Sequence, residues 1–297
     1  MTTRAMRLTR FDDGPGILAA AGDYLVAREA QHNLPLGILG TLRDRPEVYP
    51  EPPYLAVVMD GDPIALVAVR TPPWDLVLSE AGVPERRIPE AVDVLIGDLL
   101  TAAPDLPGVL GPPSTVGPFV ARWSDRTGET ASLAMAERAY RLTRVVPPEP
   151  VPGRWRFAEE SDRALLVDWI EAFHREALLA RDVRQDIGAM VDRFVHDPGR
   201  WTYLWEVDGR SVSLVCAGAA TPNGIRIGPV YTPPGHRRTG YAGALTAAAS
   251  QDQLDRGRRF CFLFTDLANK TSNHIYQAVG YEPVTDIDRY RLERPAR

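Results

Sequence analysis

The chain has 297 residues, of which 44% are apolar and 25% are charged, and its formal net charge is -5. This length and composition are those of a globular protein of about two domains. The net negative charge argues against a protein whose main task is to hold a nucleic acid backbone. No apolar run reaches the length of a membrane span, and the first residues lack the apolar core of a signal peptide. We therefore expect no nucleic acid partner, no membrane insertion and a cytoplasmic location.

An internal repeat gives the domain plan. The segment Tyr54–Ala68 aligns with Thr202–Cys216 at an offset of 148 residues, and both contain an Asp-Gly pair typical of a hairpin turn. At nearly the same offset, the sequence RAYRLTR around Tyr140 is similar to DRYRLER around Tyr290. Chance similarity between two hairpins is the alternative, but the shared offset favours a duplicated unit.

A proline-rich segment separates the two halves. The prolines of VVPPEPVPG, from Val145 to Gly153, favour an extended backbone and oppose both a helix and a central strand. We therefore expect a first domain over residues 1–146, a linker over 147–153 and a second domain over 154–297.

The pattern of the second half predicts an antiparallel meander followed by one β-α-β unit. Apolar residues at helical spacing follow Ser161, which is a residue type that starts helices. In chain order the predicted elements are a strand at Trp155–Ala158, helices at Ser161–Leu179 and Arg184–His196, strands at Trp201–Val207, Ser211–Ala219 and Ile225–Tyr231, a helix at Gly240–Arg256, a strand at Phe260–Thr265, a helix at Ser272–Val279, and strands near Tyr281 and Arg289.

The most informative segment is IRIGPVYTPPGHRRTGYAGALTAAASQ, residues 225–251. An apolar strand ends at Tyr231, a Pro-Pro-Gly turn follows, and small residues open a helix near Gly240. The start of a helix presents unpaired N–H groups and the positive end of its dipole, so this turn can hold an anion such as a pyrophosphate. Gly240 allows a ligand to approach the backbone closely, and Arg237 and Arg238 add positive charge.

The pattern Arg237-x-x-Gly240-x-Ala242 after such a strand resembles the acetyl-CoA signature of the GNAT superfamily of N-acetyltransferases. A second block, FCFLFTDLANKTSNHIYQAVGYEPV over residues 260–284, is similar to the second half of the same signature: a strand, a loop with an Asn, and a helix. An unrelated β-α-β nucleotide-binding protein is the alternative, but neither G-x-G-x-x-G nor the P-loop pattern is present.

The resemblance implies a cofactor site. In the family the loop amides hold the pyrophosphate, the preceding strand pairs with the pantetheine arm, and a loop Asn contacts the same region. The implied cofactor-binding residues are Val230, Tyr231 and Thr232 for pantetheine, Arg237, Arg238, Thr239, Gly240, Tyr241, Ala242 and Gly243 for pyrophosphate, and Asn269 and Asn273 from the second block.

The resemblance also implies that Tyr276 stands near the cofactor sulfur as general acid. A phenol with a pKa of ~10 stays protonated at pH 7, so it can donate to a departing thiolate whose thiol has a pKa of ~8.5 if it resembles cysteine. Aromatic packing between helix and sheet is the alternative role for Tyr276.

The general base is open. Strand Ile225–Tyr231 has no carboxylate, although many members of the family carry a Glu on or near this strand. Glu206, Asp266 and His174 are candidates, and a chain of water molecules could replace them. Asp266 also stands where a strand meets a loop, so it could instead brace that loop. His174 lies on a helix that in the family lines the acceptor pocket.

The sequence predicts neither a metal site nor a disulfide. No His pairs at i, i+4 with another His or Cys, and the two cysteines, Cys216 and Cys261, form no C-x-x-C pair.

The first half lacks these cofactor signals. Where its phosphate loop should stand, Pro89 and Glu90 lie near the helix start, and a carboxylate there would repel a phosphate. The segment GVLGPPSTVGPFVARWSDRTG, residues 108–128, resembles the Asn-bearing loop and helix but has no Tyr at the acid position. We therefore expect a degenerate first domain, which either walls the acceptor pocket or only stabilises the fold.

Together these features predict an α/β fold of two GNAT-like domains, each a mixed and largely antiparallel sheet flanked by helices. The resemblance implies an enzyme that transfers an acetyl or other short acyl group from acetyl-CoA to a primary amine of a small molecule or peptide, by direct attack in a ternary complex. A non-catalytic acyl-CoA-binding or regulatory module is the main alternative, and a mycothiol-synthase-like acetyltransferase is a minor one. Members of the family often pair, so a homodimer is an option.

Overall fold

The computed structural model describes residues 5–177 and 186–294, and these form two compact units. Unit 1 contains the chain up to Ala139, Asp266–Ala268 and the chain from Val284. Unit 2 contains Tyr140–Thr265 and Asn269–Pro283. From the sequence we placed residues 284–297 in the second domain. The structure instead groups them with unit 1, because the last strand pairs with β5 of that unit.

Unit 1 has a mixed sheet in the order β1-β2-β3-β4-β5-β12-β6. The neighbours from β1 to β4 are antiparallel, β4 and β5 are parallel, and β12 is antiparallel to β5. Its elements are β1 (Met6–Phe11), α1 (Gly14–Ala27), α2 (Asn33–Asp44), β2 (Tyr54–Asp60), β3 (Ile64–Arg70), β4 (Leu76–Leu78), α3 (Ile88–Ala102), β5 (Gly108–Gly111), α4 (Pro113–Thr127) and most of β6 (Thr130–Leu142) and β12 (Glu282–Glu293). The last residues of β6, from Tyr140, and the first of β12, up to Pro283, belong to unit 2.

Unit 2 repeats this plan with the order β11-β10-β9-β8-β7. The neighbours from β7 to β10 are antiparallel, and β10 and β11 are parallel. Its elements are β7 (Arg154–Phe157), α5 (Arg163–Glu176), α6 (Ile187–His196), β8 (Trp201–Val207), β9 (Arg210–Gly218), β10 (Gly224–Tyr231), α7 (Tyr241–Asp255), β11 (Phe260–Asp266) and α8 (Lys270–Val279).

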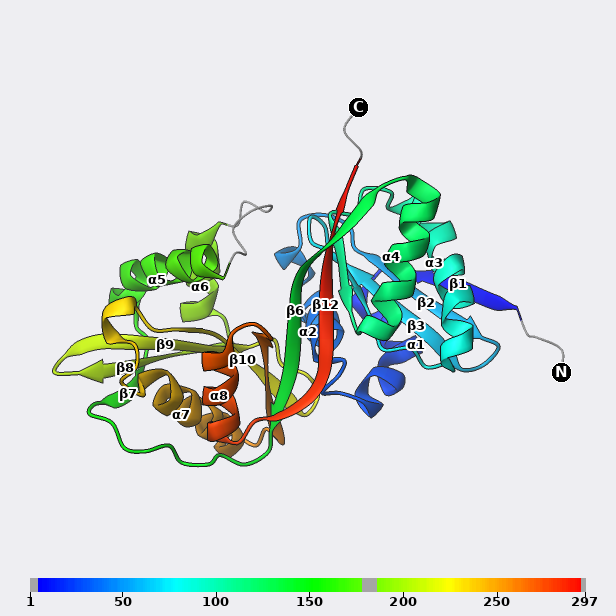
Figure 1. Ribbon diagram of the computed structural model, residues 1–297. Helices are drawn as coiled ribbons and strands as arrows, with labels where there is room; N and C mark the ends of the chain where they lie inside the picture. Colours follow the sequence, from blue (N-terminus) through cyan, green and yellow to red (C-terminus); the bar gives the residue numbers. More distant parts are fainter. Residues whose placement is uncertain (1–4, 178–185, 295–297) are drawn as a thin grey trace. The chain divides into compact units, whose positions relative to one another are not determined.

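Helices cover both faces of each sheet. In unit 2 helices α5 and α6 lie on one face of the sheet, and α7 and α8 lie on the other (Figure 1). The side chains alternate along β8, so that Tyr203 packs with α7 and α8 while Leu204 packs with α5 and α6. In unit 1 the same alternation directs Ala56 toward α3 and α4, and Leu55 toward α1 and α2. Each unit is thus a helix–sheet–helix sandwich, and the predicted fold class is confirmed.

The hairpins of the two units support the interpretation of a duplication. The predicted pair of segments forms β2–β3 in unit 1 and β8–β9 in unit 2. In unit 2 the turn residues Asp208 and Gly209 both have positive φ, 49° and 73°, as a tight hairpin turn requires. The sequences around Tyr140 and Tyr290 likewise lie on corresponding long strands, β6 and β12.

Most of the predicted helices are present with adjusted ends. The helix predicted from Ser161 is α5, preceded by a short 3-10 turn at Glu160–Asp162. Its predicted end at Leu179, and the predicted start of the next helix at Arg184, lie outside the described residues. Helix α8 begins at Lys270, two residues earlier than predicted, because the side chain of Asn269 caps it.

The proline-rich segment between the halves has no helix or strand over residues 145–153. It nevertheless lies against unit 2. The backbone N–H of Val146 donates to the carbonyl of Val279 at 2.8 Å, and the indole of Trp205 donates to the carbonyl of Pro152 at 2.8 Å. The segment is therefore anchored at both of its ends on one unit.

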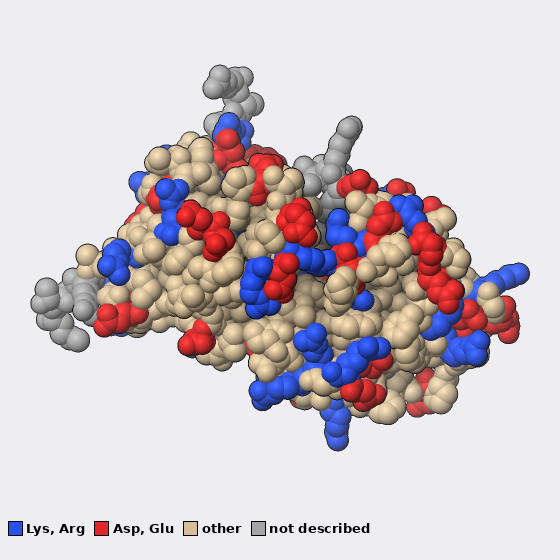
Figure 2. Space-filling model, turned by 180° about the vertical axis from the view of Figure 1, so that it is seen from behind, with Lys and Arg blue, Asp and Glu red and all other residues tan. Residues whose placement is uncertain are grey.

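Charges of both signs occur together on the surface. On the face drawn in Figure 2, basic and acidic side chains lie beside one another. Among the described helices, none is long and apolar enough to cross a bilayer.

Candidate functional site

Strand β10 leaves its parallel partner before it ends. Within the described residues, the register with β11 extends only to Arg226 opposite Phe262, whereas β10 continues to Tyr231. Beyond Arg226, the backbone N–H and C=O groups on the edge of β10 that faces β11 therefore lie outside the β10–β11 hydrogen-bond ladder. Such groups can pair with an extended ligand in the way that an added strand would.

A bulge on the other edge of β10 accompanies this divergence. Ile227 lies opposite Ala217 of β9, but Val230 lies opposite Val215, so that one extra residue is inserted in β10. Gly228 in this bulge has φ 140°, a conformation that favours glycine. A bulge bends its strand, so the sequence Gly-Pro turns the end of β10 away from a regular course.

Helix α7 starts directly after this strand without a side-chain cap. Its N-cap residue is Gly240, in the left-handed conformation with φ 86°, and the first helical bond joins the N–H of Ala244 to the carbonyl of Gly240 at 3.0 Å. The N–H groups of the three residues between them have no partner within the helix. The approach to this terminus, residues 234–240, is exposed to solvent. The predicted phosphate loop is thus open and presents donors and the positive end of a dipole.

The side chain of Arg237 does not extend freely from the loop. Its Nε donates to the carbonyl of Thr232 at 2.8 Å, and its Nη2 donates to Glu176 at 2.6 Å. The guanidinium also lies 5.7 Å from the ring centre of Tyr231. These contacts tie the loop to the end of β10 and to α5, whereas Arg238 beside it is exposed.

Glu176 is a site residue that we did not predict. It is the last residue of α5, and its two carboxylate oxygens accept from the hydroxyl of Tyr231 at 3.2 Å and from Arg237 at 2.6 Å. Its helix is the one predicted to line the acceptor pocket, but the contact joins residues 55 positions apart. Sequence spacing therefore gave no signal for it.

The two predicted asparagines are engaged within unit 2. The side-chain oxygen of Asn269 accepts from the N–H of Ser272 at 3.0 Å and caps α8. Asn273 donates to the carbonyl of Asn269 at 2.8 Å and accepts from the hydroxyl of Tyr140 at 2.8 Å. Both side chains thus stabilise the start of α8.

Tyr276 lies on α8 close to the start of α7. A methyl group placed on Gly243, in the first turn of α7, would be 3.6 Å from Cγ2 of Ile275, the residue before Tyr276. Tyr276 is 8% exposed and packs against Tyr281 with 6.2 Å between ring centres. Burial raises the pKa of Tyr276 to about 12, so its hydroxyl keeps its proton at neutral pH.

The three candidate bases have different surroundings. The carboxylate of Glu206 accepts from Arg156 at 2.9 Å within a network of ion pairs. Asp266 accepts from the N–H of Ala268 at 2.8 Å and so braces its loop. In the described part of the chain, no hydrogen bond occupies the ring nitrogens of His174. Burial lowers the pKa of His174, which favours the neutral imidazole that a base requires.

The corresponding positions of unit 1 differ. Helix α3 starts after Arg87, and Glu90 in its first turn forms an ion pair with Arg87. Phe119 on α4 corresponds in position to Tyr276 on α8, since each is the seventh residue after the N-cap of its helix. Phe119 is fully buried. Unit 1 therefore has a carboxylate where a phosphate would lie and no hydroxyl where the acid would stand.

No group of three or more His, Cys, Asp or Glu side chains among the described residues is arranged to hold a metal ion.

Comparison with known proteins agrees with this geometry. Residues 207–291 match the family model described as FR47-like protein. The matched segment extends from the end of β8 into β12 and includes the α7 loop and α8. No curated protein sequence matches the chain.

Solved structures share the fold over nearly the whole chain. A tandem GNAT protein from the clavulanic acid biosynthesis pathway has 15% identity and a TM-score of 0.59, and the match covers 98% of this chain and 100% of that one. A GNAT-family acetyltransferase from Colwellia psychrerythraea has 10% identity and a TM-score of 0.59, covering 97% and 100%. A GCN5-related N-acetyltransferase from Kribbella flavida has 18% identity and a TM-score of 0.53, covering 78% and 88%. The expected GNAT-like fold in a tandem arrangement is confirmed.

Proposed function

We propose that the protein is an N-acetyltransferase that moves an acetyl or other short acyl group from acetyl-CoA to a primary amine of a small molecule or peptide. The FR47-like match around the α7 loop and the likeness to GNAT acetyltransferases support this class. The observation that carries the proposal is the open edge of β10 directly before the uncapped start of α7.

These two features fit the two parts of the cofactor. The N–H groups of Tyr241, Ala242 and Gly243 can bind a diphosphate, because they have no partner in the helix and lie at its positive end. The backbone of Val230 and its neighbours can pair with the amides of the pantetheine arm, as the resemblance implies. Arg237 contributes by holding the loop to β10 and α5.

Tyr276 is the proposed general acid. Acetyl-CoA supplies an activated thioester carbonyl and a thiolate leaving group. Because burial holds the pKa of Tyr276 at about 12, its hydroxyl is protonated at the moment the thiolate departs and can donate to it. The position of α8 beside the first turn of α7 supports this role, since Ile275 touches that turn.

His174 is the proposed route for the proton of the attacking amine, directly or through a water molecule. An amine must lose its charge before it attacks a carbonyl, and a neutral imidazole accepts that proton near pH 7. Glu206 and Asp266 are already engaged by Arg156 and by the loop backbone. Attack occurs directly within a ternary complex, since the site has no free thiol to carry the acyl group: both cysteines are buried.

A second candidate function is a non-catalytic acyl-CoA-binding or regulatory module. The absence of a carboxylate from β10, sequence GIRIGPVY, is the observation that favours it. Two measurements separate the two functions: calorimetric titration with acetyl-CoA, and thiol release from acetyl-CoA over a panel of primary amines. The acetyltransferase predicts binding and turnover with at least one amine. Tight binding without turnover on any amine would support the module, and no binding would refute both.

A further inference from the structure

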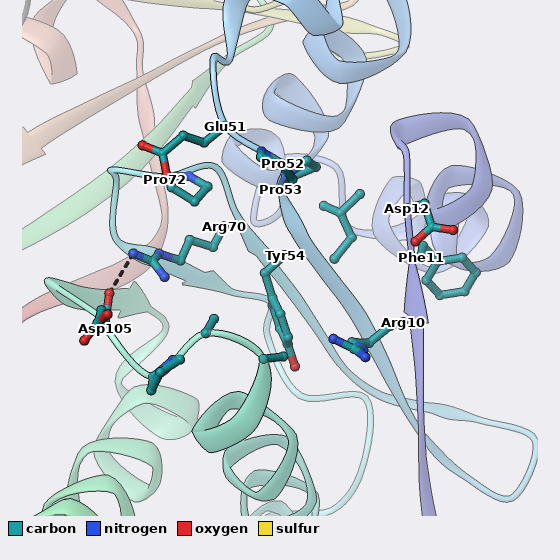
Figure 3. A pocket seen from close by; sticks show the side chains of 14 residues that line it. Arg10, Phe11, Asp12, Glu51, Pro52, Pro53, Tyr54, Arg70, Pro72 and Asp105 are labelled. Carbon is teal, nitrogen blue, oxygen red and sulfur yellow. Dashed lines mark hydrogen bonds between the residues drawn. The ribbon is translucent and has the colours of Figure 1, made fainter.

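A cavity of about 690 Å³ opens in unit 1. It is bounded by the end of β1, the start of β2, the end of β3 and the C-terminal end of α3 (Figure 3). Helix α3 has 15 residues, so the cavity lies about 22 Å along the helix from the N-terminus at which a phosphate would bind. The volume is in the range of sites that bind small molecules. Acyl transfer as proposed above makes no use of it.

Arg70 places its guanidinium in the wall of this cavity. The residue is 8% exposed, and its guanidinium donates to the carbonyls of Trp74 and Asp105, at 3.2 and 2.7 Å. Within the described chain, no carboxylate lies at ion-pair distance from it, and Nη1 has no protein partner. Burial lowers the pKa of Arg70, and the carboxylates of Asp105, Glu51 and Asp75 oppose this shift electrostatically. A buried cation of this kind favours an anionic partner.

The remaining lining is apolar below and charged at the rim, where the basic Arg10 lies together with acidic residues. Tyr54 contributes its ring, since its hydroxyl is bonded to Asp98 at 2.8 Å, and Figure 3 shows Arg70 and Arg10 on opposite sides of it. Asp12 and Glu51 are exposed at the edge. The last carbonyls of α3 add the negative end of the helix dipole.

The corresponding place in unit 2 has a smaller cavity, of about 420 Å³, lined by Trp201, Arg256, Gly257 and Arg258. Ala103 and Arg256 are the C-cap residues of α3 and α7. The guanidinium of Arg256 lies over the rings of Phe157 and Trp201, at 5.6 and 5.4 Å from their centres. Ala103 has no such side chain, and the cavity in unit 1, at about 690 Å³, is the larger of these two.

We propose that this cavity binds a small zwitterion of the amino-acid class. Its carboxylate pairs with Nη1 of Arg70, and its ammonium group faces Asp12 on the opposite side of the cavity (Figure 3). A dianionic phosphate fits less well, because the carboxylates of Asp12, Glu51 and Asp105 line the same cavity as Arg10 and Arg70. The site is separate from the proposed acetyl-CoA site, so each can be tested without the other.

The test uses the full chain and four probes: 5-aminopentanoate, pentanoate, pentylamine and inorganic phosphate. Dissociation constants are measured by calorimetric titration. We expect 5-aminopentanoate to bind most tightly, at least about tenfold better than the other three. Equal binding of pentanoate would overturn the ammonium contact, and preference for phosphate or no binding of any probe would overturn the class of ligand.

Three variants locate the binding. Arg70→Met removes the charge, and Ala103→Phe fills the cavity while Arg70 keeps its backbone contacts. Both variants should bind 5-aminopentanoate about tenfold or more weakly than the wild type. Arg86→Met, at an exposed arginine of the same unit, should leave the affinity for 5-aminopentanoate unchanged. If the Arg70→Met variant does not fold, the Ala103→Phe variant tests the location of the site. An unchanged affinity for 5-aminopentanoate in Ala103→Phe would refute the site.

Discussion

Arg237 Nη2 lies 2.6 Å from Oε2 of Glu176, so the arginine of the predicted phosphate signature is held by a carboxylate of its own unit. The same guanidinium donates to the carbonyl of Thr232. Both side chains of the ion pair are about two-fifths exposed, at 42% and 44%, so the pair itself contributes little to stability. Its consequence is geometric, because it fixes the loop that leads into α7.

This relationship predicts how Glu176→Gln behaves. If Arg237 serves as a brace, the substitution leaves acetyl-CoA affinity unchanged or lowers it by less than about tenfold, because the Thr232 contact remains. If Arg237 instead binds the diphosphate directly, freeing it from Glu176 should strengthen binding. Calorimetric titration of acetyl-CoA distinguishes the two, with Glu171→Gln on the same helix as the control.

Gly243→Glu tests the anion site at α7. A carboxylate in the first turn should repel the diphosphate and weaken the binding of acetyl-CoA at least tenfold, or by ~1.4 kcal/mol of binding free energy. The backbone at Gly243 is helical and a Cβ there would make only an ordinary contact, 3.6 Å from Cγ2 of Ile275, and an acidic residue near a helix start is favourable. Gly243→Gln is the control of equal size, and equal loss in both variants would attribute the effect to bulk.

Gly240 is the less suitable position for that test. Its φ of 86° disfavours any other residue, and a methyl group there would lie 2.8 Å from Cγ1 of Val151. A loss of affinity in Gly240→Glu would therefore mix strain with repulsion.

Tyr276→Phe should reduce kcat by about 10²-fold or more while KM for acetyl-CoA changes little, because only the proton donor is lost. Steady-state thiol release measures both constants. Tyr281→Phe is the matched control: this neighbouring hydroxyl is bonded to Ser250 at 2.8 Å, so its loss should lower thermal stability and leave kcat unchanged. Equal kcat in Tyr276→Phe and wild type would remove Tyr276 from the chemistry.

His174→Gln should change the pH profile. Burial lowers the pKa of His174, so the active neutral form persists below the usual range and the rate falls only as the pH drops through that lowered value. In the variant this acidic limb of kcat/KM should disappear and the plateau should fall. A limb that survives the substitution would assign the proton transfer to another group.

Stability should fall in alkali. Burial raises the pKa of Cys216 and Cys261 from 9.0 to about 12 and that of Tyr276 from 10.0 to about 12. Between pH 9 and 12 these groups ionise in the unfolded chain but not in the folded one, so the free energy of unfolding decreases as pH rises. Each contributes a slope of up to about 1.4 kcal/mol per pH unit. Urea unfolding at pH 8 and 10.5 measures it, and Cys261→Ala should reduce the difference.

The sequence predicted the repeated fold well, because alternating and helical apolar patterns are local signals. The hairpin at Asp208 and the helix after Gly240 are where the pattern places them. The pairing of the last strand with β5 joins residues such as Tyr290 and Val109 that no local pattern connects, so it could not be predicted from the sequence.

The candidate site was predictable only in part. Gly240 at the start of α7 could be identified from its spacing in the sequence pattern, and the loop before it, residues 234–240, is exposed to solvent. The partners of individual side chains depend on packing between distant segments, as with Glu176 and Tyr231 or Asn273 and Tyr140. Roles assigned by resemblance to Arg237, Asn269 and Asn273 therefore stay predictions beside the structural contacts that these side chains make.

A crystal structure of the chain with acetyl-CoA tests the central claim most directly. We predict the diphosphate on the N–H groups of Tyr241–Gly243, the pantetheine arm along β10, and the thioester within hydrogen-bonding reach of the Tyr276 hydroxyl. Acetyl-CoA bound at the start of α3 in unit 1, or a thioester remote from Tyr276, would contradict the account.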